Sequence, residues 1–248
     1  MGKPFQREAK MKGILRGFAF VLLTLFIFNN ASLAKNSGDI IKQRERNTVS
    51  LELEFTKKNP SGLQRLVSFL NWGINGYATG FLVGDNLVIT AYHVVSGELD
   101  ESKKIALGFS RDEDLEAKVY IGGCQAKVLG VDKDADLALL EMCGSRQAAS
   151  PPFQSIVNKD EKLLLIARPH GDKIVSRGTF HGSYNFKGID YWAVKIDARD
   201  GFSGSPVYNE RGEVVGVFSG FDWAQRLAVI SPGERAQKLL TQYAPGNP

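Results

Sequence analysis

The sequence predicts an all-β protein, built as a sandwich or a barrel. Short runs of strand length recur along the chain, and turn residues separate them. The clearest run is Thr48–Phe55, in which every odd-numbered residue is apolar and every even-numbered residue is polar. Helical periodicity is rare by comparison, and about a dozen short strands at close spacing are typical of barrels and sandwiches.

The expected strands follow one another from residue 48 to residue 230. In the first half they are Thr48–Phe55, Phe81–Val83, Leu87–Thr90, Ile105–Phe109, Ala117–Ile121, Ala126–Val131 and Leu137–Met142. In the second half they are Lys162–Ile166, Ile174–Phe180, Tyr191–Ile196, Val207–Tyr208, Glu213–Ser219 and Arg226–Ile230. The polar segment Ser145–Pro152 is the expected seam between these two halves.

Two helices are also expected. Leu63, Leu66, Val67 and Leu70 have helical spacing behind a Ser61 cap. The stretch Ser231–Tyr243 offers a serine cap, then proline at the first helical position and two leucines as apolar anchors.

The first 34 residues have the three-part layout of a secretory signal peptide. Five Lys or Arg against one Glu give this stretch the whole formal net charge of +4, and the apolar run Phe18–Phe28 follows. Ser32 and Ala34 are the small residues before the expected cut, which leaves Lys35 as the first residue. The alternative is an uncleaved membrane anchor, but this run is shorter than the roughly 20 residues that span a bilayer. Met11 is an alternative start.

The charge distribution argues against a nucleic-acid partner. Residues 35–248 contain equal numbers of basic and acidic residues, so the expected mature protein is neutral. A neutral protein has no electrostatic footprint for a phosphate backbone. We therefore expect no nucleic acid as partner and no stable membrane insertion after signal cleavage.

Cys124 and Cys143 are the two cysteines, and both lie in the exported part. An even count in an oxidising compartment predicts a disulfide, and two thiols alone make a poor metal site. If Val131 faces Leu137 in the expected hairpin, Cys124 falls opposite Gly144, one step from Cys143. The alternative is two free buried thiols. No metal or other cofactor is expected.

Three short segments contain residues suited to nucleophilic catalysis. His93 follows an apolar strand in TAYHVV, Asp136 enters a strand in DKDADLALLEM, and Ser203 lies in the glycine-rich turn RDGFSGSPVY. Amide hydrolysis needs a nucleophile, a base and a group that fixes the base, as well as donors for the developing oxyanion. His170 and His181 have no comparable neighbourhood. The order His, Asp, Ser differs from the Ser, Asp, His of the α/β-hydrolases.

These segments resemble the trypsin-like (chymotrypsin-fold) serine proteases of bacteria, especially the HtrA-type and glutamyl-endopeptidase-type domains. The resemblance spans Val49 to Leu240, through TGFLVGDNLVITAYHVV, VLGVDKDADLALLEM, GFSGSPVYNERGEVVGVFSG and LAVISPGERAQKLL. It implies two antiparallel six-stranded barrels, at about 45–148 and 149–230, with a C-terminal helix and a triad in the cleft between the barrels. Residues 35–248 would form this one protease domain.

The resemblance also assigns roles. Ser203 would be the nucleophile, His93 the general base and acid, and Asp136 the residue that orients His93; Asp132 and Asp134 are rivals of Asp136. The N–H groups of Gly201 and Ser203 would form the oxyanion hole. Substrates would be proteins or peptides, cleaved in the periplasm or outside the cell.

Several positions depart from the family pattern. Phe202 replaces the usual Asp or Asn before the serine, which argues against activation by a newly cut N-terminus. We expect Phe202 to pack into the second barrel, with Arg199 and Asp200 as polar supports of the loop. VGVFSGF has no histidine to select glutamate, and no PDZ domain is expected after Leu240.

The residues of the primary pocket bear on substrate specificity. Asp197 would lie at the base of the primary pocket and select Lys or Arg, or else be structural. Ser219, Gly220 and Phe221 would line the pocket wall, and Phe221 would favour small or medium apolar residues. The leading interpretation is an exported serine endopeptidase. The alternatives are a catalytically silenced module that binds peptides or proteins, and a structural envelope protein.

Overall fold

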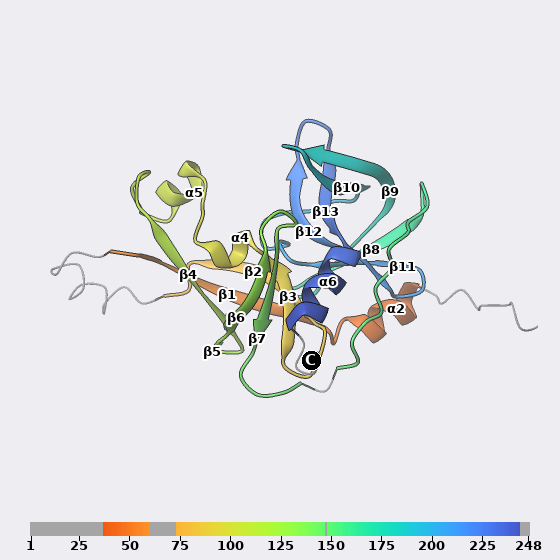
Figure 1. The fold of residues 1–248 in the computed structure, drawn as a ribbon, viewed down its shortest axis with the longest axis horizontal. Helices are drawn as coiled ribbons and strands as arrows, with labels where there is room; N and C mark the ends of the chain where they lie inside the picture. The colour runs from red at the N-terminus through yellow and green to blue at the C-terminus, as the bar shows by residue number, and fades with distance from the viewer. Residues whose placement is uncertain (1–36, 60–72, 147, 244–248) are drawn as a thin grey trace, which may run out of the picture. The chain divides into compact units, whose positions relative to one another are not determined.

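The computed structural model describes residues 37–59, 73–146 and 148–243 (Figure 1). The expected signal peptide and the expected helix in 61–70 therefore lie outside the described residues. In the described ranges, no helix combines the length and the apolar character that crossing a membrane would require.

The N-terminal half of the described chain forms one curled antiparallel sheet of seven strands, in the order β5-β4-β1-β2-β3-β7-β6. Its strands are β1 (Thr48–Lys57), β2 (Gly76–Leu82), β3 (Leu87–Ala91), β4 (Leu115–Ile121), β5 (Cys124–Gln125), β6 (Lys127–Asp132) and β7 (Leu137–Glu141). The sheet is not a closed six-stranded barrel, because β5 is only two residues long and forms no ladder with β6, the strand at the opposite edge.

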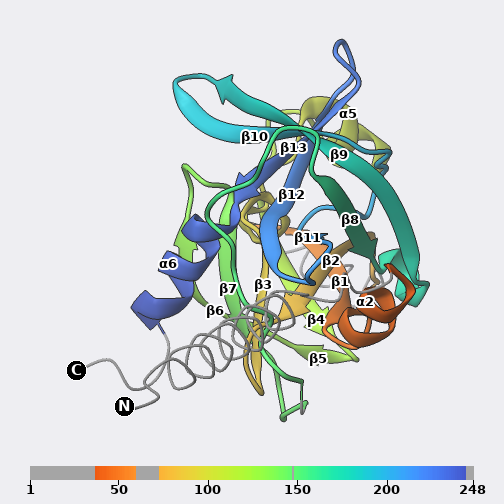
Figure 2. The same cartoon turned by 90° about the vertical axis from the view of Figure 1, so that its right-hand side faces the viewer.

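The C-terminal half is a closed barrel of six strands, in the order β10-β13-β12-β11-β8-β9 (Figure 2). Its strands are β8 (Lys162–Ala167), β9 (Ile174–Phe186), β10 (Ile189–Lys195), β11 (Pro206–Asn209), β12 (Val214–Asp222) and β13 (Leu227–Pro232). The predicted all-β class is confirmed, with the first barrel present as a curled sheet.

Three apolar clusters fill the fold, and the strand period explains them. Successive residues of a strand point to opposite faces of the sheet. In β8, Leu163 and Leu165 point into the closed barrel, whereas Leu164 and Ile166 join a cluster shared with the first sheet. Strands β3 and β7 also contribute to this shared cluster and to the interior of the first sheet. Because both of their faces are buried, these strands are continuous apolar runs in the sequence.

Four helices complete the described structure: α2 (Ser37–Arg44), α4 (His93–Ser96), α5 (Glu101–Ala106) and α6 (Gly233–Tyr243), with a short turn of 3₁₀ helix, η1 (Pro169–Gly171). Helix α6 confirms the expected C-terminal helix, except that Ser231 and Pro232 still belong to β13. It packs against strands of both halves, β6 and β7 on one side and β12 and β13 on the other.

The prediction of a strand at Ile105–Phe109 is wrong. Asp100 accepts a hydrogen bond from the N–H of Lys103 at 2.8 Å and so caps helix α5, which includes Ile105. The side chain of Ile105 is 50% exposed, so this short apolar run does not line a core. The capping aspartate decides the conformation here, because a run this short fits either helix or strand.

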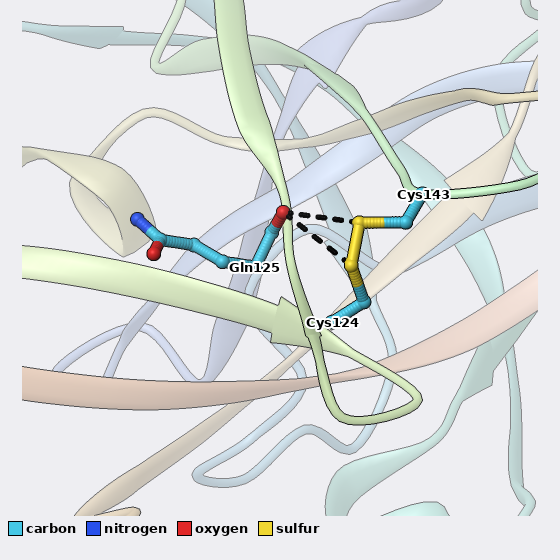
Figure 3. The surroundings of a disulfide bond; sticks show 3 residues. All are labelled: Cys124, Gln125 and Cys143. Carbon is cyan, nitrogen blue, oxygen red and sulfur yellow. Dashed lines mark hydrogen bonds between the residues drawn. A yellow bond between two sulfur atoms is a disulfide. The ribbon is translucent and has the colours of Figure 1, made fainter.

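Cys124 and Cys143 form a disulfide, with their Cα atoms 6.1 Å apart (Figure 3). The bond joins edge strand β5 to the residues that follow β7, beside the carbonyl group of Gln125. The expected register near the turn is one residue off, since Val131 faces Ala138 and Asp132 faces Leu137. A bulge between Val128 and Gly130 inserts one extra residue into β6. On the cysteine side of the bulge the pairing therefore follows the expected register, with Val128 opposite Leu140.

Candidate active site

His93 is the first residue of helix α4, separated from the end of β3 by Tyr92, and its ring connects the two other candidate residues. Its Nδ1 lies 2.8 Å from Oδ2 of Asp136, and its Nε2 lies 2.8 Å from Oγ of Ser203. The backbone N–H of His93 also donates to Oδ1 of Asp136 at 2.9 Å. One carboxylate therefore holds both the backbone and the ring of the histidine.

Asp136 lies in the tight turn between β6 and β7. Its φ of 52° is in the left-handed region, which aspartate tolerates better than most residues. The carbonyl group of Asp136 accepts from the N–H of Tyr92 at 3.0 Å, so the turn is attached to the start of α4.

The two rival aspartates have other partners. Asp132 accepts from the N–H of Ala135 at 3.0 Å, and Nη2 of Arg235 lies 3.0 and 2.9 Å from its two carboxylate oxygens. Asp134 is exposed, and its carbonyl group accepts from the hydroxyl of Tyr191 at 2.8 Å. Of the three carboxylates, Asp136 is the one that contacts His93.

Tyr191 is a further titratable group beside this turn. Burial raises the pKa of its phenol, and the negative charge of Asp136 raises that pKa further. The hydroxyl therefore stays protonated at neutral pH and keeps donating to the turn.

Ser203 lies between β10 and β11 in a turn made of glycines with positive φ. Gly201 has φ 85° and Gly204 has φ 82°, values that L side chains rarely adopt. A Cβ on Gly204 would collide with the Thr79 carbonyl oxygen and the Thr90 hydroxyl, and one on Gly201 would come 2.6 Å from Cβ of Pro169. The turn thus lies closer to the first sheet at Gly204, and closer to η1 at Gly201, than a side chain would allow.

The N–H groups of Gly201 and Ser203 are the expected oxyanion donors. Within residues 37–59, 73–146 and 148–243, neither group has a protein hydrogen-bond acceptor. Phe202, between them, is 1% exposed and packs edge-on against Phe218, with ring centroids 6.4 Å apart, among the residues that fill the closed barrel. Its own N–H donates to the backbone carbonyl group of Arg199 at 3.2 Å.

A cleft of about 480 Å³ opens over His93 and Ser203. Ser219, Gly220 and Phe221 line it, as does Asp200, whereas Asp197 is exposed and is not among the lining residues. Ala198, Phe218 and Phe221 make one wall apolar, and Trp223, 77% exposed, lies at the rim.

Sequence reasoning missed two supporting contacts. The hydroxyl of Ser219 donates to Oδ2 of Asp136, in addition to lining the cleft. Thr79, in β2, contacts the turn of Ser203 through both its backbone and its side chain. Both contacts join segments far apart in the chain, so no local sequence pattern indicates them.

A curled β-sheet and a closed β-barrel, with serine, histidine and aspartate hydrogen-bonded in a cleft, define the class of chymotrypsin-like serine hydrolases. Comparison with known families agrees: the chain belongs to the trypsin-like peptidase domain family, whose model matches residues 78–217. This matched region includes His93, Asp136 and Ser203.

Two relatives in sequence have the same name, probable periplasmic serine endoprotease DegP-like. The protein from Ectopseudomonas mendocina is 29% identical over 173 residues, which cover 65% of this chain and 31% of that protein. The protein from Pseudomonas putida is 29% identical over 148 residues, covering 57% of this chain and 28% of that protein. The chain thus spans about a third of the length of these relatives.

Solved structures share the fold. The active form of the Rv3671c protease from M. tuberculosis has a TM-score of 0.59 and 17% identity, over 84% of this chain and 86% of that chain. A serine endoprotease from Yersinia pestis has a TM-score of 0.57 and 15% identity, over 84% of this chain and 66% of that chain.

Proposed function

We propose that this protein is an exported serine endopeptidase that cleaves peptide bonds through an acyl-enzyme on Ser203. The observation that carries the proposal is the unbroken chain of hydrogen bonds from Asp136 through His93 to Ser203. Such a chain is what makes a serine hydroxyl nucleophilic.

The reaction follows from this geometry. Oγ of Ser203 attacks the carbonyl carbon of the substrate while Nε2 of His93 takes its proton, and Asp136 stabilises the imidazolium. The N–H groups of Gly201 and Ser203 donate to the oxyanion. The tetrahedral intermediate collapses, the amine leaves with the proton from His93, and an ester to Ser203 remains. A water molecule, deprotonated by His93, then hydrolyses the ester and restores Ser203.

The cleft supports a preference for apolar residues before the cleaved bond. Phe218, Phe221 and Ala198 form its apolar wall, and Asp197 lies away from it. Asp200 is the carboxylate among the described lining residues, and it is exposed, so a buried cationic side chain would have no buried counter-charge. We therefore propose that Lys and Arg are not selected. Phe221 narrows the space and favours small or medium apolar side chains.

Export rests on the sequence of residues 1–34 and on the word periplasmic in the names of the relatives. We propose that cleavage after Ala34 releases a protein that acts in the periplasm or outside the cell.

A fluorophosphonate probe tests the activity directly, because it forms a covalent bond only with an activated serine. The purified protein should be labelled at Ser203, and Ser203→Ala and His93→Ala should abolish labelling and lower kcat by about 10⁶-fold. Ser110→Ala, at an exposed serine away from the cleft, is the matched control and should be labelled like the wild type. A folded wild type that stays unlabelled at every pH between about 6 and about 9 would instead indicate a silent peptide-binding module.

A further inference from the structure

The hydroxyl of Thr79 contacts the loop that bears the candidate nucleophile. Thr79 is completely buried in β2, and its Oγ1 donates to the carbonyl group of Gly201 at 2.8 Å. The same oxygen accepts from the N–H of Arg168 at 3.0 Å. The backbone N–H can only donate and the carbonyl can only accept, so the direction of both hydrogen bonds is fixed.

The backbone of Thr79 contacts the same loop a second time. Its N–H donates to the carbonyl group of Ser203 at 2.9 Å, and its own carbonyl accepts from the hydroxyl of Thr90 in β3 at 2.8 Å. Thr79 therefore holds the carbonyl groups on both sides of Phe202, and every polar group of Thr79 has a partner.

We propose that Thr79 is a positioning residue for the oxyanion loop, defined here as Gly201–Ser203; this rests on the proposed function of the same site. A peptide unit is planar, so fixing a carbonyl group fixes the orientation of the whole unit. Gly201 has φ 85° and no side chain, so its backbone dihedral angles are the least restricted in the loop. The Thr79 hydroxyl holds the peptide unit that joins Gly201 to Phe202. This unit lies between the two units that contain the N–H groups of Gly201 and Ser203, so holding it restricts the orientation of both donors.

Two features of the loop explain why such a restraint is needed. Phe202 is apolar and offers no charge that could anchor the loop by an ion pair. Arg168, which orients the hydroxyl, directly follows β8 in the closed barrel, whereas Thr79 belongs to the first sheet. The hydroxyl thus sets the loop against both halves of the fold at once.

The test compares substitutions that keep or remove the hydroxyl. Thr79→Val keeps the shape and the backbone hydrogen bonds but removes the hydroxyl, and Thr79→Ser keeps it. We expect Thr79→Val to lower kcat by about 10- to 100-fold with KM within about 3-fold, and Thr79→Ser to stay near the wild type. Thr79→Ala serves if the valine variant does not fold. Thr56→Val, in β1 outside the cleft, is the matched control and should leave kcat unchanged.

Two further measurements separate positioning from a general loss of structure. A peptide boronic acid mimics the tetrahedral state, so its Ki should rise in Thr79→Val in parallel with the loss of kcat/KM. Binding of an uncleaved peptide to Thr79→Val/Ser203→Ala should match binding to Ser203→Ala alone. A merely structural defect would weaken both ligands equally and would overturn the proposal.

Crystal structures of the wild type and of the two variants test the restraint without any activity. The carbonyl group of Gly201 should keep its place in Thr79→Ser and rotate away in Thr79→Val. If the loop of Thr79→Val superimposes on that of the wild type, the proposal is wrong, whether or not the enzyme is active. An unlabelled wild type would refute the proposed function, and these structures would still decide the role of Thr79.

Discussion

At the scale of single residues, Asp136 differs from its acidic neighbours in backbone as well as in side chain. Its left-handed φ of 52° turns its carboxylate toward both nitrogen donors of His93, the backbone N–H and the ring Nδ1. Residues held in sparsely populated backbone regions often lie at functional sites, where surrounding contacts maintain them. Here the contacts come from Tyr92 and Ser219.

The first prediction concerns the choice among the aspartates. Asp136→Asn should lower kcat by about 10⁴-fold, because the amide no longer stabilises an imidazolium. Asp134→Asn, the matched control, removes an exposed carboxylate of the same turn and should change kcat little. Steady-state kinetics on a chromogenic peptide measures both. A larger loss in Asp134→Asn would show that the assignment of the acid is wrong.

The second prediction concerns Gly204. Alanine at this position would combine a positive φ of 82° with a collision against the Thr79 carbonyl and the Thr90 hydroxyl. Gly204→Ala should therefore destabilise the protein strongly and abolish labelling of Ser203. Gly188→Ala, at φ 84° with open space around it, isolates the backbone strain of about 1–2 kcal/mol. Urea unfolding compares the two variants, and equal losses would contradict the proposed steric role.

At the scale of elements, the strands of the shared core were predictable because the hydrophobic pattern alone determines them. Strands β3, β7 and β8 have both faces buried, so each is a continuous apolar run. The segment 105–109 is apolar too, but the cap at Asp100 makes its first residues helical, and a short run does not distinguish the two conformations.

The candidate triad could also be predicted, since each of its members lies in a distinctive local segment. The residues that support the candidate triad could not be predicted from the sequence. Thr79 and Ser219 are ordinary strand residues in the sequence, and their hydrogen bonds to the loop and to Asp136 depend on how distant strands pack. The bulge in β6 was also missed, although Gly130 lies beside it and an isolated glycine inside a strand run indicates such a bulge.

The third prediction concerns the disulfide, which joins β5 to the end of β7 across the open side of the first sheet. Cys124→Ser/Cys143→Ser should lower the free energy of unfolding by roughly 3 kcal/mol, because the unfolded chain regains the entropy of an open loop. Urea unfolding of the oxidised protein and of the double variant measures the difference. Equal stability of the two would show that the bond does not constrain the unfolded chain.

At the scale of the whole molecule, the two halves share one apolar core and one hydrogen-bond network around Ser203. Helix α6 adds to this coupling, since Arg235 contacts Asp132 in the turn that bears Asp136, while Ala236 and Leu239 lie in the shared core. The geometry of the cleft is thus set by the packing of the entire domain.

The fourth prediction is that the protein is active as soon as it folds. Phe202 is buried among apolar side chains, so this position offers no carboxylate that could form an ion pair with a new N-terminal ammonium group. Thr79 also forms a hydrogen bond to the loop without any cleavage of the chain. Protein that starts at Lys35 and protein with an N-terminal tag should have the same kcat/KM within about 3-fold. A large loss in the tagged protein, restored when the tag is removed, would contradict this expectation.

The disulfide also has a consequence for covalent topology. Together with the backbone from Cys124 to Cys143 it closes a ring, and Asp136 is a member of that ring. Lys133 and Asp134 are exposed residues of the turn within this ring, where a protease could cut the chain. A single cut there would leave the two fragments tethered, with the strands on either side still paired. The candidate acid, Asp136, would thus stay attached to both fragments after a nick that would separate the fragments of an uncrosslinked chain.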